Sequence, residues 1–163
     1  MARGRPLPRE QQVAIFRRDR WICCWCDRPV IFAPALKYLE LDLHERSKYK
    51  GKLAYFHPNL TRRNAPLLDA LAAVLDHVEA AKLGGATDAK NLVTSCNKCN
   101  MKKNALPLEK WKQLYPAPKP IRSTYGEPED WDGFSSLFIV LSDQYSDKFT
   151  SAEKDWLKAL KQS

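Results

Sequence analysis

The sequence contains no long hydrophobic run. Its longest apolar runs, such as Ala70–Leu75, have six residues, far fewer than the ~20 residues that cross a bilayer, so no membrane-spanning helix is predicted. The first residues are not followed by an apolar segment of the kind that forms a secretory signal. Disorder is excluded because five Trp, six Tyr and six Phe can build a core. We expect a cytoplasmic chain of 163 residues that forms one domain, or a small domain with an appendage.

Negative charge is scarce in the first two-thirds of the chain. Residues 1–112 carry 21 Lys and Arg against 11 Asp and Glu, a net charge of +10, whereas residues 113–163 carry 6 against 8, a net charge of −2. This division indicates a polyanionic partner for the first part only. A basic protein without such a partner is the alternative, because net charge reports only non-specific attraction.

The five cysteines fall into two tight clusters, Cys23-Cys24-Trp25-Cys26 and Cys96-Asn97-Lys98-Cys99. Each cluster contains a C-x-x-C pair, and in an intracellular chain two such pairs indicate a Cys₄ zinc site. Thiolates three residues apart on a tight turn can reach one cation at ~2.3 Å, and a second pair completes a tetrahedron. Cys23, Cys26, Cys96 and Cys99 are the predicted ligands, and Cys24 points elsewhere. A redox pair or unrelated core cysteines are the alternatives.

The hydrophobic periodicity predicts mixed helices and strands. Helices are expected over 9–18 (with Val13, Ile15 and Phe16 inward), 66–68, 97–104 and 108–114, and strands over 72–78 and 91–93, with strand character also at 30–32 and 39–43. Residues 116–120 predict a stiff proline-rich linker. An apolar stretch at 134–141 and a capping box at Thr150–Glu153 precede a last helix.

Polar residues with metal-ligand and base chemistry lie beside the second cysteine pair. Several segments in fixed order carry a likeness to a known family. They are Arg18-Asp19-Arg20-Trp21-Ile22-Cys23-x-x-Cys26, Leu75-Asp76-His77-Val78, Gly84-Gly85, Asn91-Leu92-Val93 and Cys96-x-x-Cys99-Asn100-x-x-Lys103. In these segments the chain resembles the HNH nuclease family. The resemblance covers about residues 10–106 without the insert at 27–71. It implies an α+β fold in which a ββα-metal core, stabilised by the Cys₄ zinc, carries a long insert and a mostly helical C-terminal tail. The implied parts are a basic arm (1–8), the nuclease domain (9–112) and an extension (113–163).

The resemblance implies an HNH endonuclease that hydrolyses phosphodiester bonds of DNA with one catalytic metal. His77 suits general-base work because imidazole titrates near neutrality. Asp76 and Asn100 offer hard oxygen ligands for Mg²⁺ or Mn²⁺. Adjacent strand residues point to opposite faces, so Asp76 and His77 must lie where the strand ends or bulges. Asn91 would hold the loop that orients His77. Phosphate contacts are expected from Lys103, Lys102, Arg62 and Arg63.

Each of these residues also has a structural interpretation. Asn91 can be a turn residue, Asn100 a helix cap, and the basic pairs at 62–63 and 102–103 solvated side chains. His44 and His57 are expected to pack or hydrate. Trp111, Trp131 and Trp156 are expected to pack in the core or the tail.

The sequence departs from the family pattern at two positions. Asn100 replaces a histidine, which favours oxygen ligands and a hard metal, and Ala80 stands where a proline is common. A non-catalytic zinc-containing nucleic-acid binder, or a subunit of a defence, packaging or recombination assembly, is the alternative function. The presence of all four site residues argues against a decayed site. The resemblance implies an intracellular protein of bacterial or phage type, and leaves open whether it acts as a homodimer or in a larger assembly.

Overall fold

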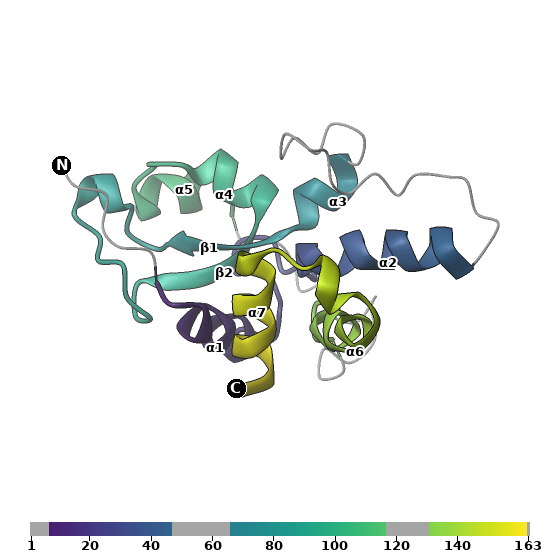
Figure 1. Cartoon of the computed structure of the whole chain (residues 1–163). Coiled ribbons are helices and arrows are strands. Elements are labelled where there is room, and N and C mark those ends of the chain that lie inside the picture. The colour runs from purple at the N-terminus through teal and green to yellow at the C-terminus, as the bar shows by residue number, and fades with distance from the viewer. Residues whose placement is uncertain (1–6, 47–65, 117–130, 163) are drawn as a thin grey trace.

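The computed structural model describes residues 7–46, 66–116 and 131–162. Predictions for residues 1–6, Arg62, Arg63, His57 and the linker after Pro116 lie outside them. A two-stranded antiparallel sheet crosses the middle of the molecule, formed by β1 (Ala73–His77) and β2 (Leu92–Cys96). In Figure 1, helices α4 (Asn97–Lys103) and α5 (Leu108–Leu114) lie on one side of the sheet, and α1 (Arg9–Arg18) and α7 (Ser151–Gln162) lie on the other. The α+β prediction is confirmed.

The strand register places the second cysteine pair and the polar site at opposite ends of the hairpin. Ala73 pairs with Cys96 at one end, and His77 pairs with Leu92 at the other. The chain from Val78 to Asn91 connects the strands and contains a short 3-10 turn, Ala81–Leu83. Helix α4 starts directly after β2 and packs back on both strands. The observed β–β–α unit is the one that the sequence predicts over 72–104.

Helix α1 anchors the start of β2 from the other side of the sheet. Arg18 donates to the carbonyl oxygens of Ala89 (2.7 Å) and Leu92 (2.8 Å). Asp19 accepts the backbone N–H of Thr94 at 2.7 Å. Val13, Ile15 and Phe16 are buried, as the helical spacing predicts. The polar end of α1 therefore fixes the hairpin while its apolar face joins the core.

The strand character at 39–43 is a wrong prediction. These residues belong to helix α2 (Ala33–Arg46). The segment 30–32 forms no strand, and its pairing is limited to the isolated bridge between Ile31 and Ala72. The apolar–polar alternation of Leu39–Leu43 suggests a strand, but leucine and glutamate are good helix formers. Packing decides the outcome because α2 buries Ala35, Leu36 and Tyr38 and lies along α6 (Ser135–Tyr145).

The remaining short helix, α3 (Pro66–Leu71), begins where the sequence predicts and leads into β1. Helix α5 has the predicted bounds. Thr150 and Glu153 form the predicted capping box before α7, since the Thr150 N–H donates to Glu153 Oε2 (2.8 Å) and the Glu153 N–H donates to Thr150 Oγ1 (3.3 Å).

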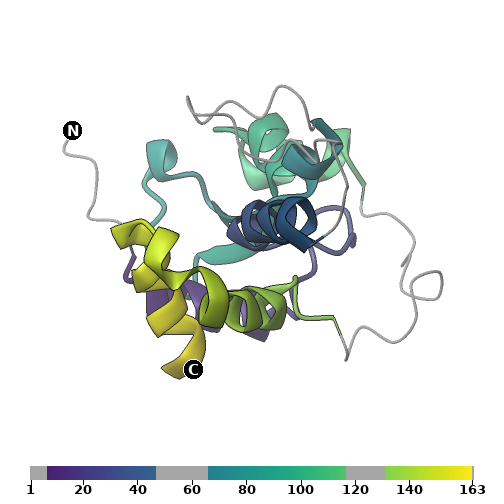
Figure 2. The same ribbon diagram turned by 45° about the vertical axis from the view of Figure 1, so that its right-hand side comes forward.

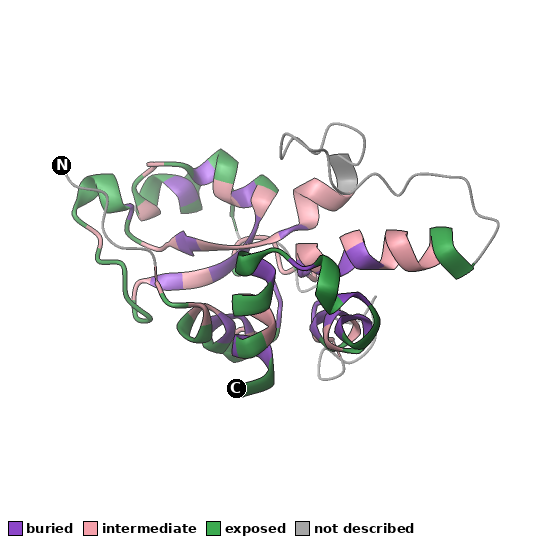
Figure 3. Cartoon of the chain, in the orientation of Figure 1, coloured by how far each residue is buried: buried purple, intermediate pink, exposed green. Residues whose placement is uncertain are grey.

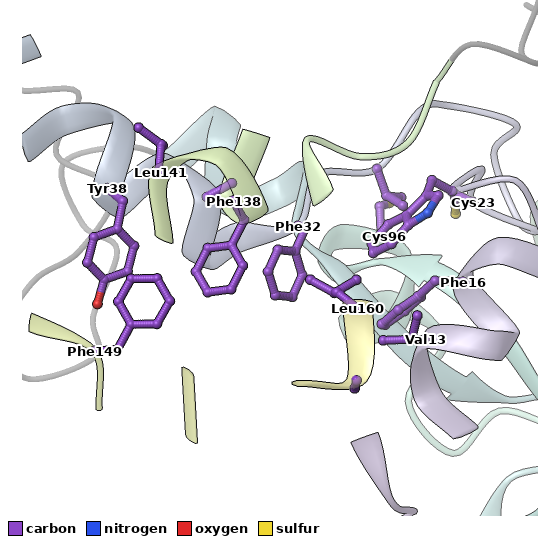
Figure 4. Packing of buried hydrophobic residues seen from close by; sticks show 14 of the residues in the cluster. Val13, Phe16, Cys23, Phe32, Tyr38, Cys96, Phe138, Leu141, Phe149 and Leu160 are labelled. Carbon is purple, nitrogen blue, oxygen red and sulfur yellow. The ribbon is translucent and has the colours of Figure 1, made fainter. Parts of the chain in front are cut away.

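A row of aromatic side chains forms the core of the helical part. Figure 4 shows it running from Tyr38 and Phe149 through Phe138 and Phe32 towards Phe16. Neighbouring rings pack closely, with centroids 4.3 Å apart for Tyr38–Phe149 and 4.9 Å for Phe138–Phe149. The C-terminal helices thus share one core with α1 and α2. Among the described residues, no helix is long and apolar enough to cross a membrane.

The turn before α6 requires a glycine. Gly133 has a φ of +67°, and a Cβ atom there would lie 2.5 Å from the Trp21 ring. Its carbonyl accepts the Phe32 N–H at 2.7 Å. Asp132 caps α6 by accepting the N–H groups of Phe134 (2.9 Å) and Ser136 (2.7 Å). This turn brings the C-terminal helices back to the core.

Candidate active site

The four predicted cysteine ligands lie close together at the end of the sheet that contains Cys96. The Sγ atoms of Cys23, Cys26, Cys96 and Cys99 all lie within 4.8 Å of one another, and Cys26 and Cys96 are separated by 3.9 Å. Four sulfurs ~2.3 Å from a tetrahedral zinc ion would be ~3.8 Å apart. Cys24 is exposed and lies outside the group. The group could hold a metal ion such as zinc, and the exclusion of Cys24 agrees with the sequence prediction.

Local backbone geometry supports this cysteine group. Cys96 caps α4 because its sulfur accepts the backbone N–H of Cys99 at 3.4 Å. The sulfur of Cys23 lies 4.0 Å from the hydroxyl of Ser95. Hydrogen bonds among the thiols lower the pKa of Cys23 and raise that of Cys99, because one sulfur must donate where its neighbour accepts. A bound cation would remove this competition because all four sulfurs could coordinate it as thiolates.

A separate hollow opens where β1 ends. Its volume is about 300 Å³, and Asp76, His77 and Asn100 line it together with Lys82, Met101 and Asn104. His77 is the last residue of β1. At the end of a strand two adjacent side chains can share a cavity, which is the arrangement that the sequence analysis expects for Asp76 and His77. Asp76 and His77 come from the strand and Asn100 from α4. The ββα unit therefore brings three of the four predicted catalytic residues to one cavity.

Two side chains hold the Asp76 carboxylate: Trp25, which is half-buried, and Lys103, which is buried. Its Oδ2 atom accepts the indole N–H of Trp25 at 2.8 Å and lies 3.6 Å from the ammonium of Lys103. Asp76 is only 5 % exposed. Burial raises the pKa of its carboxyl group, and the charge of Lys103 and the Trp25 hydrogen bond oppose that shift. A hydrogen bond with the backbone of His77 opposes the shift as well.

Lys103 has a different place from the one expected. It is fully buried, donates to the backbone carbonyl of His77, and lies 5.1 Å from the centre of the Trp25 ring. The predicted phosphate contact is therefore wrong, because a side chain without exposed surface cannot reach a substrate phosphate. A spacing of three residues places Lys103 on the same side of α4 as Asn100, but that side packs on β1. Lys103 instead holds the strand end.

His77 and Asn91 are connected through the loop between the strands. The His77 Nε2 atom lies 3.0 Å from the hydroxyl of Thr87. The Asn91 side chain makes three hydrogen bonds to backbone groups of this loop, two with Glu79 (2.9 and 3.0 Å) and one with Ala86 (2.9 Å). Gly85 is required at its closest approach, where a Cβ atom would lie 1.8 Å from the Glu79 oxygen. These are the contacts that a loop-holding role for Asn91 requires.

The other predicted residues lie at different places. Lys102 is exposed on α4, with its ammonium 5.3 Å from the centre of the Tyr115 ring. His44 is exposed near the end of α2 and does not line the hollow. Of the tryptophans, Trp111 is a buried residue of α5, and Trp131 and Trp156 pack against the aromatic core. These positions agree with the packing role predicted for the tryptophans.

Sequence reasoning missed three residues of this site. Trp25 lies between the first two cysteine ligands, where its neighbours suggest only a metal-binding turn, and the contact with Asp76 spans 51 positions. Lys82 and Thr87 belong to the loop after His77. The available signal for Thr87 was its place four residues before Asn91, in a loop expected to orient His77.

Comparison with known proteins agrees with this geometry. Residues 66–106 match the sequence profile of the HNH endonuclease family, and this range contains α3, the hairpin and α4. No curated protein and no solved structure matches the chain significantly. The matched range contains Asp76, His77, Asn91 and Asn100 together with one cysteine pair. The segment that matches the HNH endonuclease family, residues 66–106, is therefore the segment that folds as the ββα unit.

Proposed function

We propose that this protein is a metal-dependent endonuclease that hydrolyses phosphodiester bonds of DNA at the hollow beside β1. One observation carries the proposal: the hairpin end and α4 bring Asp76, His77 and Asn100 to the same solvent-connected cavity. Hydrolysis of a phosphodiester requires a base for water, charge stabilisation at phosphorus and a stabilised leaving oxygen. An imidazole, a carboxylate and a carboxamide can supply these functions together with a divalent cation.

His77 is the proposed general base. Its Nε2 atom is engaged by Thr87, so Nδ1 is the ring nitrogen that would accept the proton of the attacking water. Asn91 holds the loop that contains Thr87 by bonding to Glu79 and Ala86. The loop thereby limits the rotation of the imidazole. This is a positioning role, in agreement with the expectation for Asn91.

Asp76 and Asn100 are the proposed ligands of Mg²⁺ or Mn²⁺. Both offer oxygen atoms, which these hard cations prefer. Among the described residues, the four cysteines are the only group of three or more acidic, histidine or cysteine side chains close enough together to hold an ion, so the hollow contains no ready-made cage of such residues. Such an open site suits a cation that also contacts substrate. A bound cation would stabilise negative charge on the scissile phosphate and on the departing 3′ oxygen. Trp25 and Lys103 would keep the Asp76 carboxylate in one orientation.

Zn²⁺ is the proposed occupant of the cysteine group, where it would stabilise the fold and take no part in hydrolysis. Four thiolates with no water or carboxylate form a closed structural set. The group includes Cys96, at the end of β2 opposite the hollow, so the ion would connect the first cysteine turn to the hairpin.

DNA phosphates outside the hollow would be bound by exposed cations. Lys102 and Lys82 are exposed in the described part of the chain, and Arg62 and Arg63 remain candidates from the sequence. The net charge of +10 in residues 1–112 supports attraction of a polyanion.

The test is nicking of supercoiled plasmid by purified protein. We expect one bound zinc ion per chain, cleavage only after Mg²⁺ or Mn²⁺ is added, and loss of cleavage in Asn100→Ala with the zinc content unchanged. Linear product at the earliest times would indicate that two active sites act together. A protein that contains zinc and binds DNA but never cleaves it would be a non-catalytic binding module, and the proposal would fail.

A further inference from the structure

A second concave surface lies on the opposite side of α4 from the hollow. The groove has a volume of about 450 Å³ and is formed by the first cysteine turn, the end of α3, α4 and α5. Asn100 and Met101 of α4 line the hollow, whereas Lys98 and Lys102 line the groove. Cys26, Cys96 and Cys99 also line the groove, so part of its volume belongs to the cysteine group. Its volume lies within the range of about 300–1,000 Å³ that is common for ligand pockets.

Aromatic rings form the floor and one wall of this groove. Trp25 and Trp111 pack edge to face with centroids 5.9 Å apart, and Trp111 lies 4.4 Å from Tyr115. Trp111 is buried, but Tyr115 is 42 % exposed and its neighbour Leu114 is 55 % exposed. Exposed apolar side chains gathered in a concave surface are typical of a binding site.

The charge of the groove selects the kind of occupant. Arg28, Lys98 and Lys102 line it, and no aspartate or glutamate does so among the described residues. Four thiolates with Zn²⁺ would carry roughly two negative charges, so three cations would leave a positive surface. Aromatic rings combined with cations and without carboxylates are the elements that bind single-stranded nucleic acid, whose bases stack while its phosphates are neutralised.

Trp25 connects the groove to the hollow. Its ring lines the groove, and its indole N–H donates to Asp76 in the hollow. The two surfaces are therefore separated by one helix and connected by the hydrogen bond between Trp25 and Asp76. A strand that passes over α4 can contact both.

We propose that this groove binds an unpaired nucleotide of the DNA strand, with the base against Tyr115 and its phosphates near Lys98 and Lys102. The proposal rests on the proposed function for its partner, and it specifies the substrate class as DNA with a locally single-stranded segment. A paired base in a duplex does not expose its face for such stacking. An acidic peptide in the groove is the competing occupant.

Binding can be measured separately from cleavage. Fluorescence anisotropy of a labelled single-stranded oligothymidylate is measured with zinc-loaded protein and no added Mg²⁺ or Mn²⁺. Tyr115→Ser removes the exposed ring, and the double variant Lys98→Ser, Lys102→Ser removes two cations without touching the core. Val140→Ser and Lys154→Ser are the controls, because both side chains are exposed on the C-terminal helices, on the other side of the molecule (Figures 1 and 2).

We expect the Kd for the oligothymidylate to rise at least about fivefold in Tyr115→Ser, the lower range for one lost stacked base. The lysine variant should weaken binding and also reduce its salt dependence, while both controls bind as the wild type does. Equal affinity in Tyr115→Ser and wild type overturns the proposal, as does displacement of the oligonucleotide by polyglutamate at equal charge concentration. Because the assay involves no hydrolysis, failure of plasmid nicking would remove the proposed activity and leave this result standing.

Discussion

The hairpin half of the molecule and the helical half are stabilised by different interactions. Around β1, β2 and α4 the buried residues include Asp76, Lys103, Thr94 and Ser95, next to four cysteine sulfurs. Around α2, α6 and α7 the interior is mainly aromatic rings, and Figure 3 shows the buried face of α6 turned towards its neighbours. Specific polar and sulfur contacts define the first half, whereas apolar packing defines the second. The hairpin half should therefore be sensitive to single chemical groups and the helical half to volume.

Loss of one cysteine ligand tests this difference with the largest expected effect. Cys99→Ser should lose the structural ion, because structural zinc contributes roughly 10–16 kcal/mol of apparent binding free energy in small zinc domains. Zinc content by mass spectrometry should fall below that of the wild type. Amide hydrogen exchange should lose protection in β1 and β2 before α6.

Cys24→Ser is the matched control, since Cys24 lies in the same turn but is exposed and outside the sulfur group. It should retain one zinc ion. Equal loss of metal in both variants would contradict the assignment of the ligands.

Replacement of the buried lysine is the next test. Lys103→Met should destabilise the protein by roughly 3–5 kcal/mol, because it leaves the Asp76 carboxylate buried without its counter-charge. Loss of a group that orients a metal ligand typically weakens metal binding 10- to 100-fold, so Mn²⁺ affinity measured by calorimetry without DNA should fall by about this factor. Lys110→Met, at an exposed position of α5, should change neither quantity. Wild-type Mn²⁺ affinity in Lys103→Met would refute the positioning role.

A cavity in the aromatic core should affect stability alone. Phe138 has no exposed surface and packs against Phe32 (5.1 Å between centroids) and Phe149. Phe138→Ala should lower the free energy of unfolding by roughly 3–5 kcal/mol. The cleavage rate per folded molecule should remain unchanged below the melting temperature. A large loss of rate with intact fold would show that the two halves are more tightly coupled than proposed.

The smallest expected effect concerns the buried carboxylate of the helical half. Burial raises the pKa of Glu153, but hydrogen bonds from Lys37, the Thr150 N–H and Tyr38 outweigh it and keep the pKa below its ordinary value. A lowered folded-state pKa means that this stabilisation is present above the unfolded-state pKa and is lost as the pH falls through the folded-state pKa.

Glu153→Gln should cost roughly 1.5–3 kcal/mol at neutral pH, the range for hydrogen bonds to a charged group. Urea unfolding should show a smaller pH dependence in the acid range for this variant than for the wild type. An unchanged acid dependence would remove Glu153 from the account.

The two halves also differ in how far the sequence predicts them. In the hairpin half, four cysteines at fixed spacing must meet at one ion, so the sequence predicts which sulfurs gather, and the structure brings those four together. The hydrophobic periodicity predicts the strands and α4 with bounds that differ from the observed ones by at most three residues. A metal-binding group can be predicted from a sequence because few arrangements of the chain bring four sulfurs to one ion.

Packing across long sequence separations was not predictable. Leu39–Leu43 has a strand-like alternation but belongs to α2, which packs along α6. Lys103 resembles an exposed basic residue of a helix, but the proximity of Asp76, 27 positions earlier, makes it a buried counter-charge. The contact of Trp25 was not predictable for the same reason, since its hydrogen-bond partner Asp76 lies 51 positions away. In each case the deciding neighbour is distant in the sequence, and no local pattern encodes it.

The rate of plasmid nicking by His77→Ala tests the central claim most directly. The measurement uses Mn²⁺, protein with verified zinc content, and His44→Ala as the control for replacement of an exposed histidine outside the hollow. Removal of a general base lowers a rate by roughly 10²- to 10⁴-fold. We predict a loss of this size in His77→Ala with zinc content and melting temperature unchanged, and the wild-type rate in His44→Ala. Cleavage by His77→Ala at the wild-type rate would contradict the assignment of the hollow as the site of hydrolysis.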